Sequence, residues 1–415
     1  MDRLRRTTRN REAGPQKMIT TRKTFAIVAL CLLSPCLWGG ENPSPEWPGD
    51  DREKKDTVSV ADTTVRRGFF RKVIDYFDDS NKNKKHKKFD FTIIGGPNYS
   101  EDTKFGIGLV AAGLYRVDPS DTLSQPSDVS LYGNVSTSGF YMVGIRGNTF
   151  FSHDKYRLLY NLSFYSFPGK FWGIGYETNT LDANKSDYTR QQYRIKTDFL
   201  IRAARNFYIG PGVGFDYVEG KDFERIDLLQ GQERLTRSIS AGFSLVYDSR
   251  DASTAASRGI YAQAEQRFFP AFMGNEYAFS RTDLIFDYYK TVWKGGVLAI
   301  DYHSQFNYGN VPWTMLAPLG TSYRMRGYYE GRYRDENIVE AQVELRQKVW
   351  RRNGIVVWAG AGNIFRDFGS FDIGQTLPNF GVGYRWEFKK KMNIRLDLGF
   401  GRNGSGIIFN INEAF

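Results

Sequence analysis

The sequence has few of the residues from which thiol and histidine sites are built. Its 415 residues include two cysteines, Cys31 and Cys36, and three histidines, His86, His153 and His303. Both cysteines fall in a segment that we predict to be removed on export, so we expect neither a disulfide nor a thiolate metal site. A serine nucleophile needs a histidine base and an orienting acid beside it, and no such motif is present. We therefore predict that the protein is not an enzyme and carries no cofactor or metal.

Long hydrophobic runs are also scarce. The longest, 25–33, is too short to cross a membrane as a helix, which needs about 20 residues. Basic residues precede it and small residues follow it, which is typical of a secretory signal. We predict that 1–40 is an upstream extension and signal peptide, with Met18 as the true start. This segment carries eight Lys or Arg and two acidic residues, so its removal leaves a charge of about +5 out of +11, and nucleic acid is not an expected partner.

Aromatic residues and glycine are abundant. Aromatics make up 16% of the chain, 42 residues are Gly, and the mean hydropathy is −0.48, which suits strands with an apolar residue at every second position. In 380–388 every even-numbered residue is apolar or aromatic, and every odd-numbered one is Gly, Arg or Glu. The alternation recurs in 392–401 and in 405–415, where Phe409 and Phe415 share the apolar face as a C-terminal strand signal. A soluble sandwich would alternate in the same way.

The lengths of the connections distinguish the two folds. We predict sixteen strands, at 104–116, 128–137, 139–150, 156–166, 170–178, 188–202, 205–219, 235–248, 258–268, 276–291, 295–308, 336–349, 354–365, 378–388, 392–401 and 405–415. Long polar connections such as 117–127 and 309–335 alternate with tight ones such as 168–169 and 294–295, as in outer-membrane barrels. An open sheet edge in lipid would leave backbone groups unpaired. We therefore predict an all-β, 16-stranded antiparallel transmembrane β-barrel over 89–415, in the outer membrane of a Gram-negative bacterium.

The region before the barrel, 41–88, is predicted to be periplasmic. Residues 41–64 are polar and have no apolar period, which indicates a flexible tail. Apolar residues fall on one face of a short amphipathic helix at 66–77, which either lies on the inner leaflet or plugs the barrel mouth, or simply packs on the rim. The basic linker 82–88 contains five Lys, and is either a solvated linker or a contact for lipid phosphates.

A charged motif is predicted at one periplasmic turn. Asp248, Arg250 and Asp251 end one strand, and Arg258 and Gly259 begin the next. The two aspartates could be taken for a catalytic carboxylate pair. Because two arginines stand beside them, an ion-pair network at the base of the barrel is the stronger interpretation.

The longest connection carries a second motif, Arg326-Gly327-Tyr328. Together with the charged turn and the aromatic C-terminal strand, it resembles the BamA/TamA family of outer-membrane assembly proteins, the bacterial surface antigen superfamily, over 89–415. In that family the arginine at the tip of this loop folds into the lumen and contacts acidic groups. The resemblance implies a loop lock in which Glu344 is the first candidate partner, although Gly360 stands where the family usually has Asp. The alternative is that Arg326 lies in an exposed loop.

The resemblance also implies a function. The family contains a variant that lacks the periplasmic repeat domains, and the short 41–88 segment resembles that variant. We expect a barrel that contributes to the insertion or translocation of proteins or lipids at the outer membrane. Expected partners are outer-membrane lipid and lipopolysaccharide, and either unfolded barrel clients or a larger assembly complex. The alternative is a structural or channel-forming barrel without insertase activity.

Overall fold

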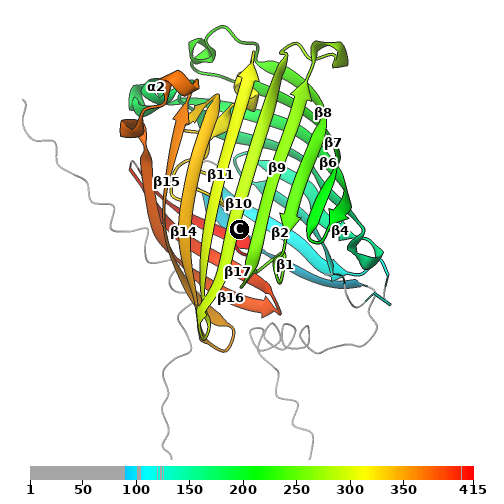
Figure 1. Cartoon of the computed structure of the whole chain (residues 1–415). Coiled ribbons are helices and arrows are strands. Elements are labelled where there is room, and N and C mark those ends of the chain that lie inside the picture. The colour runs from blue at the N-terminus through cyan, green and yellow to red at the C-terminus, as the bar shows by residue number, and fades with distance from the viewer. Residues whose placement is uncertain (1–88, 101–103, 119, 122–123, 125, 403) are drawn as a thin grey trace, which may run out of the picture. The chain divides into compact units, whose positions relative to one another are not determined.

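The structure, a computed structural model, describes residues 89–100, 104–118, 120–121, 124, 126–402 and 404–415. Sixteen of the described strands form one antiparallel sheet that curves into a barrel (Figure 1), which confirms the predicted fold class. They are β1 (Phe89–Ser100), β2 (Lys104–Tyr115), β3 (Ser127–Ser136), β4 (Tyr141–Phe150), β5 (Tyr156–Phe171), β6 (Ser186–Ala204), β7 (Phe207–Lys221), β8 (Leu235–Asp248), β9 (Gly259–Phe269), β10 (Phe279–Trp293), β11 (Gly296–Gly309), β14 (Asn337–Trp350), β15 (Asn353–Phe365), β16 (Leu377–Lys389), β17 (Met392–Gly401) and β18 (Gly404–Ile411). The predicted signal peptide, tail, helix and linker lie outside the described residues.

The predicted number of strands is right, but one strand was missed and one predicted strand does not exist. The structure adds β1 before the strand predicted at 104–116. It also extends the strand predicted at 156–166 to Phe171 as β5, so that 170–178 forms no strand of its own and leads into α2. The second error comes from 168–169, which the sequence pattern predicts to be a tight turn, and both added stretches of strand contain a proline. Pro97 lies in β1, an edge of the sheet, and Pro168 lies beyond the last residue of β5 that pairs with β4. A strand tolerates proline where it has a neighbour on one side only.

This shift places the connection 116–126 at the other end of the barrel from the one predicted. The Ser152 hydroxyl donates to the Asp118 carboxylate at 3.1 Å, and the His153 N–H donates to Asp121 at 2.6 Å. Ser152 and His153 lie in the short β4–β5 connection, on the side of the tight turns. The connection 116–126 is therefore a long connection on the short-turn side.

The long connections at the opposite end contain the short helices. The helical segments and small strands of the described chain are η2 (Ser152–Asp154), α2 (Tyr176–Thr180), η3 (Asp182–Asn184), η4 (Ile226–Leu229), η5 (Ala271–Met273), η6 (Trp313–Met315), β12 (Ala317–Pro318), β13 (Arg334–Asp335), η7 (Phe368–Ser370) and η8 (Ile373–Gln375). Only η2, among these described elements, lies elsewhere, in the short β4–β5 connection. In the described residues, no helix has the length and apolar character to cross a membrane.

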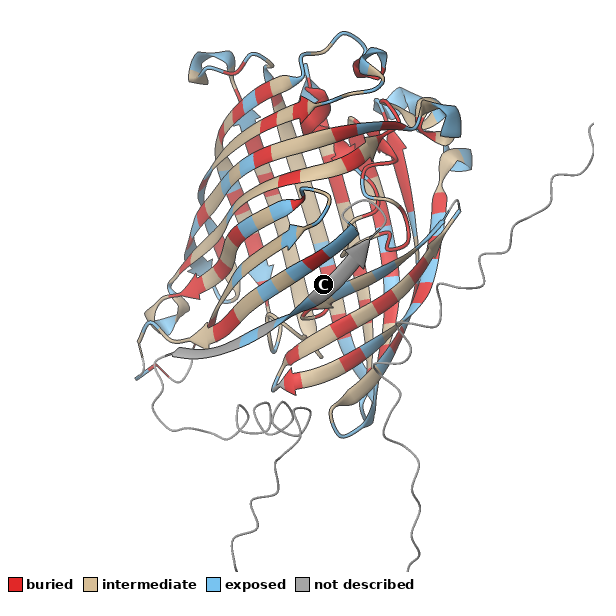
Figure 2. Cartoon of the chain, turned by 180° about the vertical axis from the view of Figure 1, so that it is seen from behind, coloured by how far each residue is buried: buried red, intermediate tan, exposed pale blue. Residues whose placement is uncertain are grey.

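The alternating pattern has its apolar face on the outside of the barrel. In β16, Phe380, Val382 and Tyr384 are exposed, whereas Asn379 and Arg385 are buried. The same bands of buried and exposed residues follow each other along most strands (Figure 2). A soluble sandwich would hide the apolar face and expose the polar one. The exposed apolar surface therefore identifies a barrel whose outer wall faces lipid.

The last strand is shorter than predicted. β18 ends at Ile411 rather than at Phe415, because Asn412 has a positive φ of 70° and turns the chain. Phe409 remains on the outer wall, with 64% of its surface exposed. Phe415, predicted to share that face, instead lies inside the barrel outline, where the C-terminal end is seen in both opposite views (Figures 1 and 2).

Candidate functional site

The connection between β11 and β14 folds back into the barrel. β12 and β13 pair within it, and Trp313, Met325 and Tyr333 are buried. Trp313 packs in an apolar cluster with Phe171 and Tyr188 of the barrel wall. This segment, residues 310–336, is called the inner loop below. Its burial means that the lumen is filled by the chain itself at this level.

Arg326 lies at the tip of the inner loop and has an exposed fraction of 0%. Its Nη2 lies 2.6 Å from Glu344 Oε2 on β14, and its Nη1 lies 2.7 Å from Asp397 Oδ2 on β17. The guanidinium carbon stands 3.7 Å from the centroid of the Trp358 ring. The alternative that Arg326 lies in an exposed loop is therefore wrong. A buried charge needs such compensation, because desolvation alone would cost several kcal/mol, ~5 or more.

Gly327 and Tyr328 complete the contact with the wall. Gly327 has a φ of +113°, and a Cβ there would lie 2.6 Å from the backbone of Gly399 on β17. Only glycine allows the loop to approach the strand so closely. The Tyr328 hydroxyl donates to the Pro378 carbonyl at 2.6 Å and accepts from the Arg402 N–H at 2.9 Å.

Asp397 is the partner that sequence reasoning missed. Gly360 occupies the position where the resemblance would place an aspartate, and a Cβ there would meet the Ala341 carbonyl and the Asn379 amide at 2.7 Å. The second carboxylate comes instead from β17, two strands further along the chain. The only available signal was the position of Asp397 on the polar face of the segment predicted at 392–401.

Further charged side chains surround the contact of Arg326 with Glu344 and Asp397. Arg346 Nε lies 2.7 Å from Glu344 Oε1, Arg385 Nη1 lies 2.5 Å from Asp397 Oδ1, and Arg385 Nε lies 2.7 Å from Glu413 Oε2. Opposite charges thus alternate across β14, β16, β17 and the residues after β18. We call this set, with Arg326, the charge lock. It ties the tip of the inner loop to the last strands of the sheet from inside.

The residues after β18 belong to the same interior. The Glu413 N–H donates to the Thr254 carbonyl at 3.2 Å. The Phe415 ring lies 6.2 Å from the Tyr289 ring and 5.0 Å from the Arg346 guanidinium carbon. Residues 412–415 therefore cross from the end of β18 to the walls of β10 and β14.

The predicted turn motif is split into two parts. Asp248 is buried between Arg250 at 3.0 Å and Arg157 at 3.0 Å. Asp251 accepts from the backbone N–H of Ser257 at 2.7 Å and of Arg258 at 3.2 Å. Arg258 itself is exposed, so its contribution to Asp251 is the backbone N–H. Gly259, at a φ of +111°, passes close to the Ser249 backbone.

The environment of Asp251 lowers its pKa. Partial burial raises the pKa, but hydrogen bonds from Ser257 and the ammonium group of Lys391 at 3.1 Å outweigh it and hold the pKa at about 2. Lys391 lies in the β16–β17 turn. The ion pair therefore connects the β8–β9 turn to the C-terminal part of the sheet at the short-turn end.

The two ends of the sheet do not form a ladder with each other. The strand order begins at β1 and ends at β18, and no pairing between them is found in the described residues. Instead, the face of β2 opposite the exposed Ile107 packs on the outward face of the last strands. The cluster contains Val110, Ala112 and Leu114 of β2 with Trp386, Phe388, Met392, Ile394 and Ile411. We call this overlap the seam.

Together, the lipid-facing wall, the inner loop and the charge lock define an outer-membrane β-barrel plugged by its own chain. The chain belongs to the Omp85 superfamily, whose domain model matches residues 133–405. Its location is therefore the outer membrane of a Gram-negative bacterium. No match is found among curated protein sequences.

The solved structures that are similar to the chain include a BamA and a CdiB barrel. The first is BamA from Haemophilus ducreyi lacking POTRA domains 1–3, with 13% identity and a TM-score of 0.51, covering 79% of this chain and 70% of that one. The second is CdiB from Acinetobacter baumannii, with 12% identity and a TM-score of 0.49, covering 79% of this chain and 60% of that one. At this identity the BamA likeness concerns the fold alone.

Proposed function

We propose that this barrel contributes to the insertion or translocation of proteins, or of lipids, at the outer membrane, and that a client strand pairs at the seam. The observation that carries the proposal is the missing ladder between β1 and β18. An edge strand offers a row of free N–H and C=O groups, and an incoming strand can add to it by β-augmentation. The edge is that of β1, not of the strand predicted at 104–116.

The charge lock supports this role. Arg326 joins β14 and β17 through Glu344 and Asp397. β17 belongs to the seam, and its position is fixed from inside by this contact with β14. The described contacts of the seam itself are apolar side-chain packing. We propose that the lock keeps the C-terminal strands in place when the seam opens.

The test is a reversible cross-link across the seam. The barrel 89–415 contains no cysteine, so Ala112→Cys with Ile411→Cys introduces a single possible disulfide between two residues of the seam cluster. We expect the oxidised protein to lose its ability to fold an unfolded barrel client in proteoliposomes, and reductant to restore it.

The matched control is Leu398→Cys with Ile407→Cys, two positions outside the seam cluster. These two residues are direct register partners within the β17–β18 hairpin, so their disulfide leaves the seam free. Full client folding with the seam disulfide closed would contradict the proposal.

A channel-forming barrel is the competing function. The inner loop fills the lumen with buried side chains such as Trp313 and Tyr333, which disfavours a wide permanent pore. In planar bilayers we expect small, flickering conductance that grows when residues 310–336 are deleted. Large, steady conductance in the unaltered protein would favour the channel. The proposed partners are outer-membrane lipid and lipopolysaccharide, with unfolded barrel clients or a larger assembly complex.

A further inference from the structure

The outer wall of β3–β7 carries an aliphatic row that runs across the strands. Leu131, Ile145, Leu162, Ile195 and Phe215 are successive register partners from one strand to the next. All five side chains face away from the lumen, on the same side as the exposed Val143 and Tyr193. This part of the wall therefore offers a continuous apolar floor.

An aromatic row lies immediately beside the aliphatic one. Phe164 pairs with Tyr193 and Tyr193 with Tyr217 in the strand register, and the ring centroids are 4.3 Å and 5.6 Å apart. The next partner in the row is Arg237 on β8. Its side chain is exposed, and its guanidinium carbon stands 6.0 Å from the Tyr217 ring.

Polar residues end the pattern. Gln191 and Glu219 are register partners one step beyond the tyrosines, and Lys221 follows two residues later. The Lys221 ammonium lies 3.3 Å from the Glu219 carboxylate, and side-chain exposures are 41% and 31%. This is the end of the barrel with the long connections, because β7 ends at Lys221. Long connections face outward in outer-membrane barrels.

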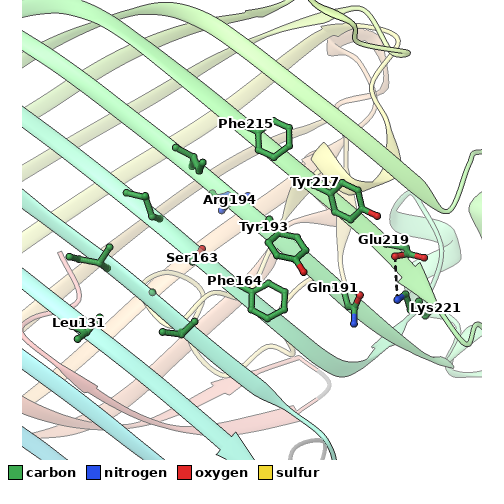
Figure 3. A pocket seen from close by; sticks show the side chains of 15 residues that line it. Leu131, Ser163, Phe164, Gln191, Tyr193, Arg194, Phe215, Tyr217, Glu219 and Lys221 are labelled. Atoms are coloured by element: carbon green, nitrogen blue, oxygen red, sulfur yellow. Dashed lines mark ion pairs between the residues drawn. The ribbon is translucent and has the colours of Figure 1, made fainter.

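The three rows enclose a shallow groove of about 820 Å³. Figure 3 shows the rings of Phe164, Tyr193 and Tyr217 side by side, with Leu131 on one side and the Glu219–Lys221 ion pair on the other. The groove crosses five strands, and at about 4.8 Å per strand it is roughly 20 Å wide. That width suits several acyl chains rather than one.

We propose that this groove binds a phosphate-bearing glycolipid of the outer leaflet, with its acyl chains on the aliphatic row and its phosphate at Arg237 and Lys221. Lipid chains are as apolar as the wall, so the apolar contact alone gives little preference for any lipid. Selectivity must come from the head group. Lys221 lines the groove and Arg237 lies beside it, next to the hydroxyls of Tyr193 and Tyr217. Glu219 is the carboxylate in the lining, while the Asp187 N–H donates to the Glu224 carboxylate further toward the long connections. The site does not depend on the seam or on client insertion.

The experiment measures retained lipid by native mass spectrometry of the full-length protein in detergent, titrated with diphosphorylated lipid A. We expect Arg237→Ala with Lys221→Ala to lower lipid A occupancy by about tenfold, the effect of losing one to two charge-assisted contacts. The control is Lys185→Ala with Arg366→Ala, which removes the same charge from exposed positions at the same end of the barrel but outside the groove. We expect no change in that variant.

Two further variants separate the site from non-specific charge. Glu219→Gln removes the carboxylate that lines the groove and is expected to raise lipid A occupancy. Leu162→Trp fills the floor without changing the charge and is expected to lower it, and the lipid-facing position tolerates an aromatic side chain. Inorganic phosphate should not compete. Equal retention of phosphatidylethanolamine, equal losses in the groove and control variants, or no response to both Glu219→Gln and Leu162→Trp would overturn the proposal.

Discussion

The wall formed by β5–β8 and the strands beside the seam are built to different lengths. β5 and β6 contain 16 and 19 residues, whereas β17 and β18 contain 10 and 8. β5 and β6 share sixteen register pairs, β17 and β18 share eight, and β18 shares none with β1 in the described residues. At about 1 kcal/mol for each net hydrogen bond, the short pair separates far more easily. The barrel thus places its weakest join at the seam and its charge lock directly behind it.

The variant with the largest expected effect on this comparison is Arg326→Ala. The change leaves Glu344 and Asp397 buried with one cation fewer, so we expect a loss of about 3–5 kcal/mol in the free energy of unfolding. Urea unfolding in detergent micelles measures it. Hydrogen exchange should rise in β17 and β18 and stay unchanged in β5 and β6.

The control for this variant is Arg332→Ala, on the same inner loop. Arg332 is buried over the Trp172 ring, but its partner Asp182 is 85% exposed, so truncation leaves no carboxylate buried without its cation. The expected loss is therefore smaller, about 1–2 kcal/mol. Equal losses in the two variants, or faster exchange spread evenly around the barrel, would contradict a lock that serves the short strands.

A smaller effect is expected from Gly327→Ala. The added Cβ meets the β17 backbone at a φ of +113°, so we expect a loss of about 2–3 kcal/mol from strain and displacement. Gly274→Ala is the matched control, because its φ is +88° with no atom within 4 Å of the added Cβ, and only the strain of about 1 kcal/mol remains. If both variants lose the same free energy of unfolding, the close approach of the inner loop to β17 does not contribute to stability.

The smallest effect concerns the ion pair at the short-turn end. The pKa of Asp251 is lowered from 3.8 to about 2, so its stabilising contribution is complete above the ordinary pKa and is lost as the pH falls toward 2. We expect Asp251→Asn to reduce the loss of thermal stability between pH 4 and pH 2. An unchanged pH profile would mean that the contact between Asp251 and Lys391 does not stabilise this end.

The fold could be predicted because the apolar period of a lipid-facing strand is local in the sequence. Whether a strand has a neighbour on both sides, by contrast, does not show in the sequence around it. Pro97 and Pro168 lie in strands because a neighbour is absent on one side, and nothing near them in the sequence reveals that. The right number of strands therefore came from two errors that cancelled.

The candidate site could be predicted only in part for the same reason. The contact of Arg326 with Glu344 followed from a family motif, whereas Asp397 depends on which strands face each other across the lumen. The inward position of Phe415 could not be predicted either. The apolar alternation of the sequence continues through Asn412, although the backbone turns at that residue. Asn412 was the one local hint, because asparagine adopts a positive φ more readily than most residues.

Because β2 overlaps the last strands through apolar side chains, the stability of the seam depends on the solvent around the barrel. In water, separating Ala112 and Ile411 from their neighbours would be opposed by the hydrophobic effect, but acyl chains can take the place of those contacts at little free-energy cost. The acyl chains of the membrane then lower the barrier to opening of the seam, and the fluidity and thickness of the bilayer set how often the seam opens. Transfer from fluid to gel-phase lipid should therefore slow its motion without altering a single residue.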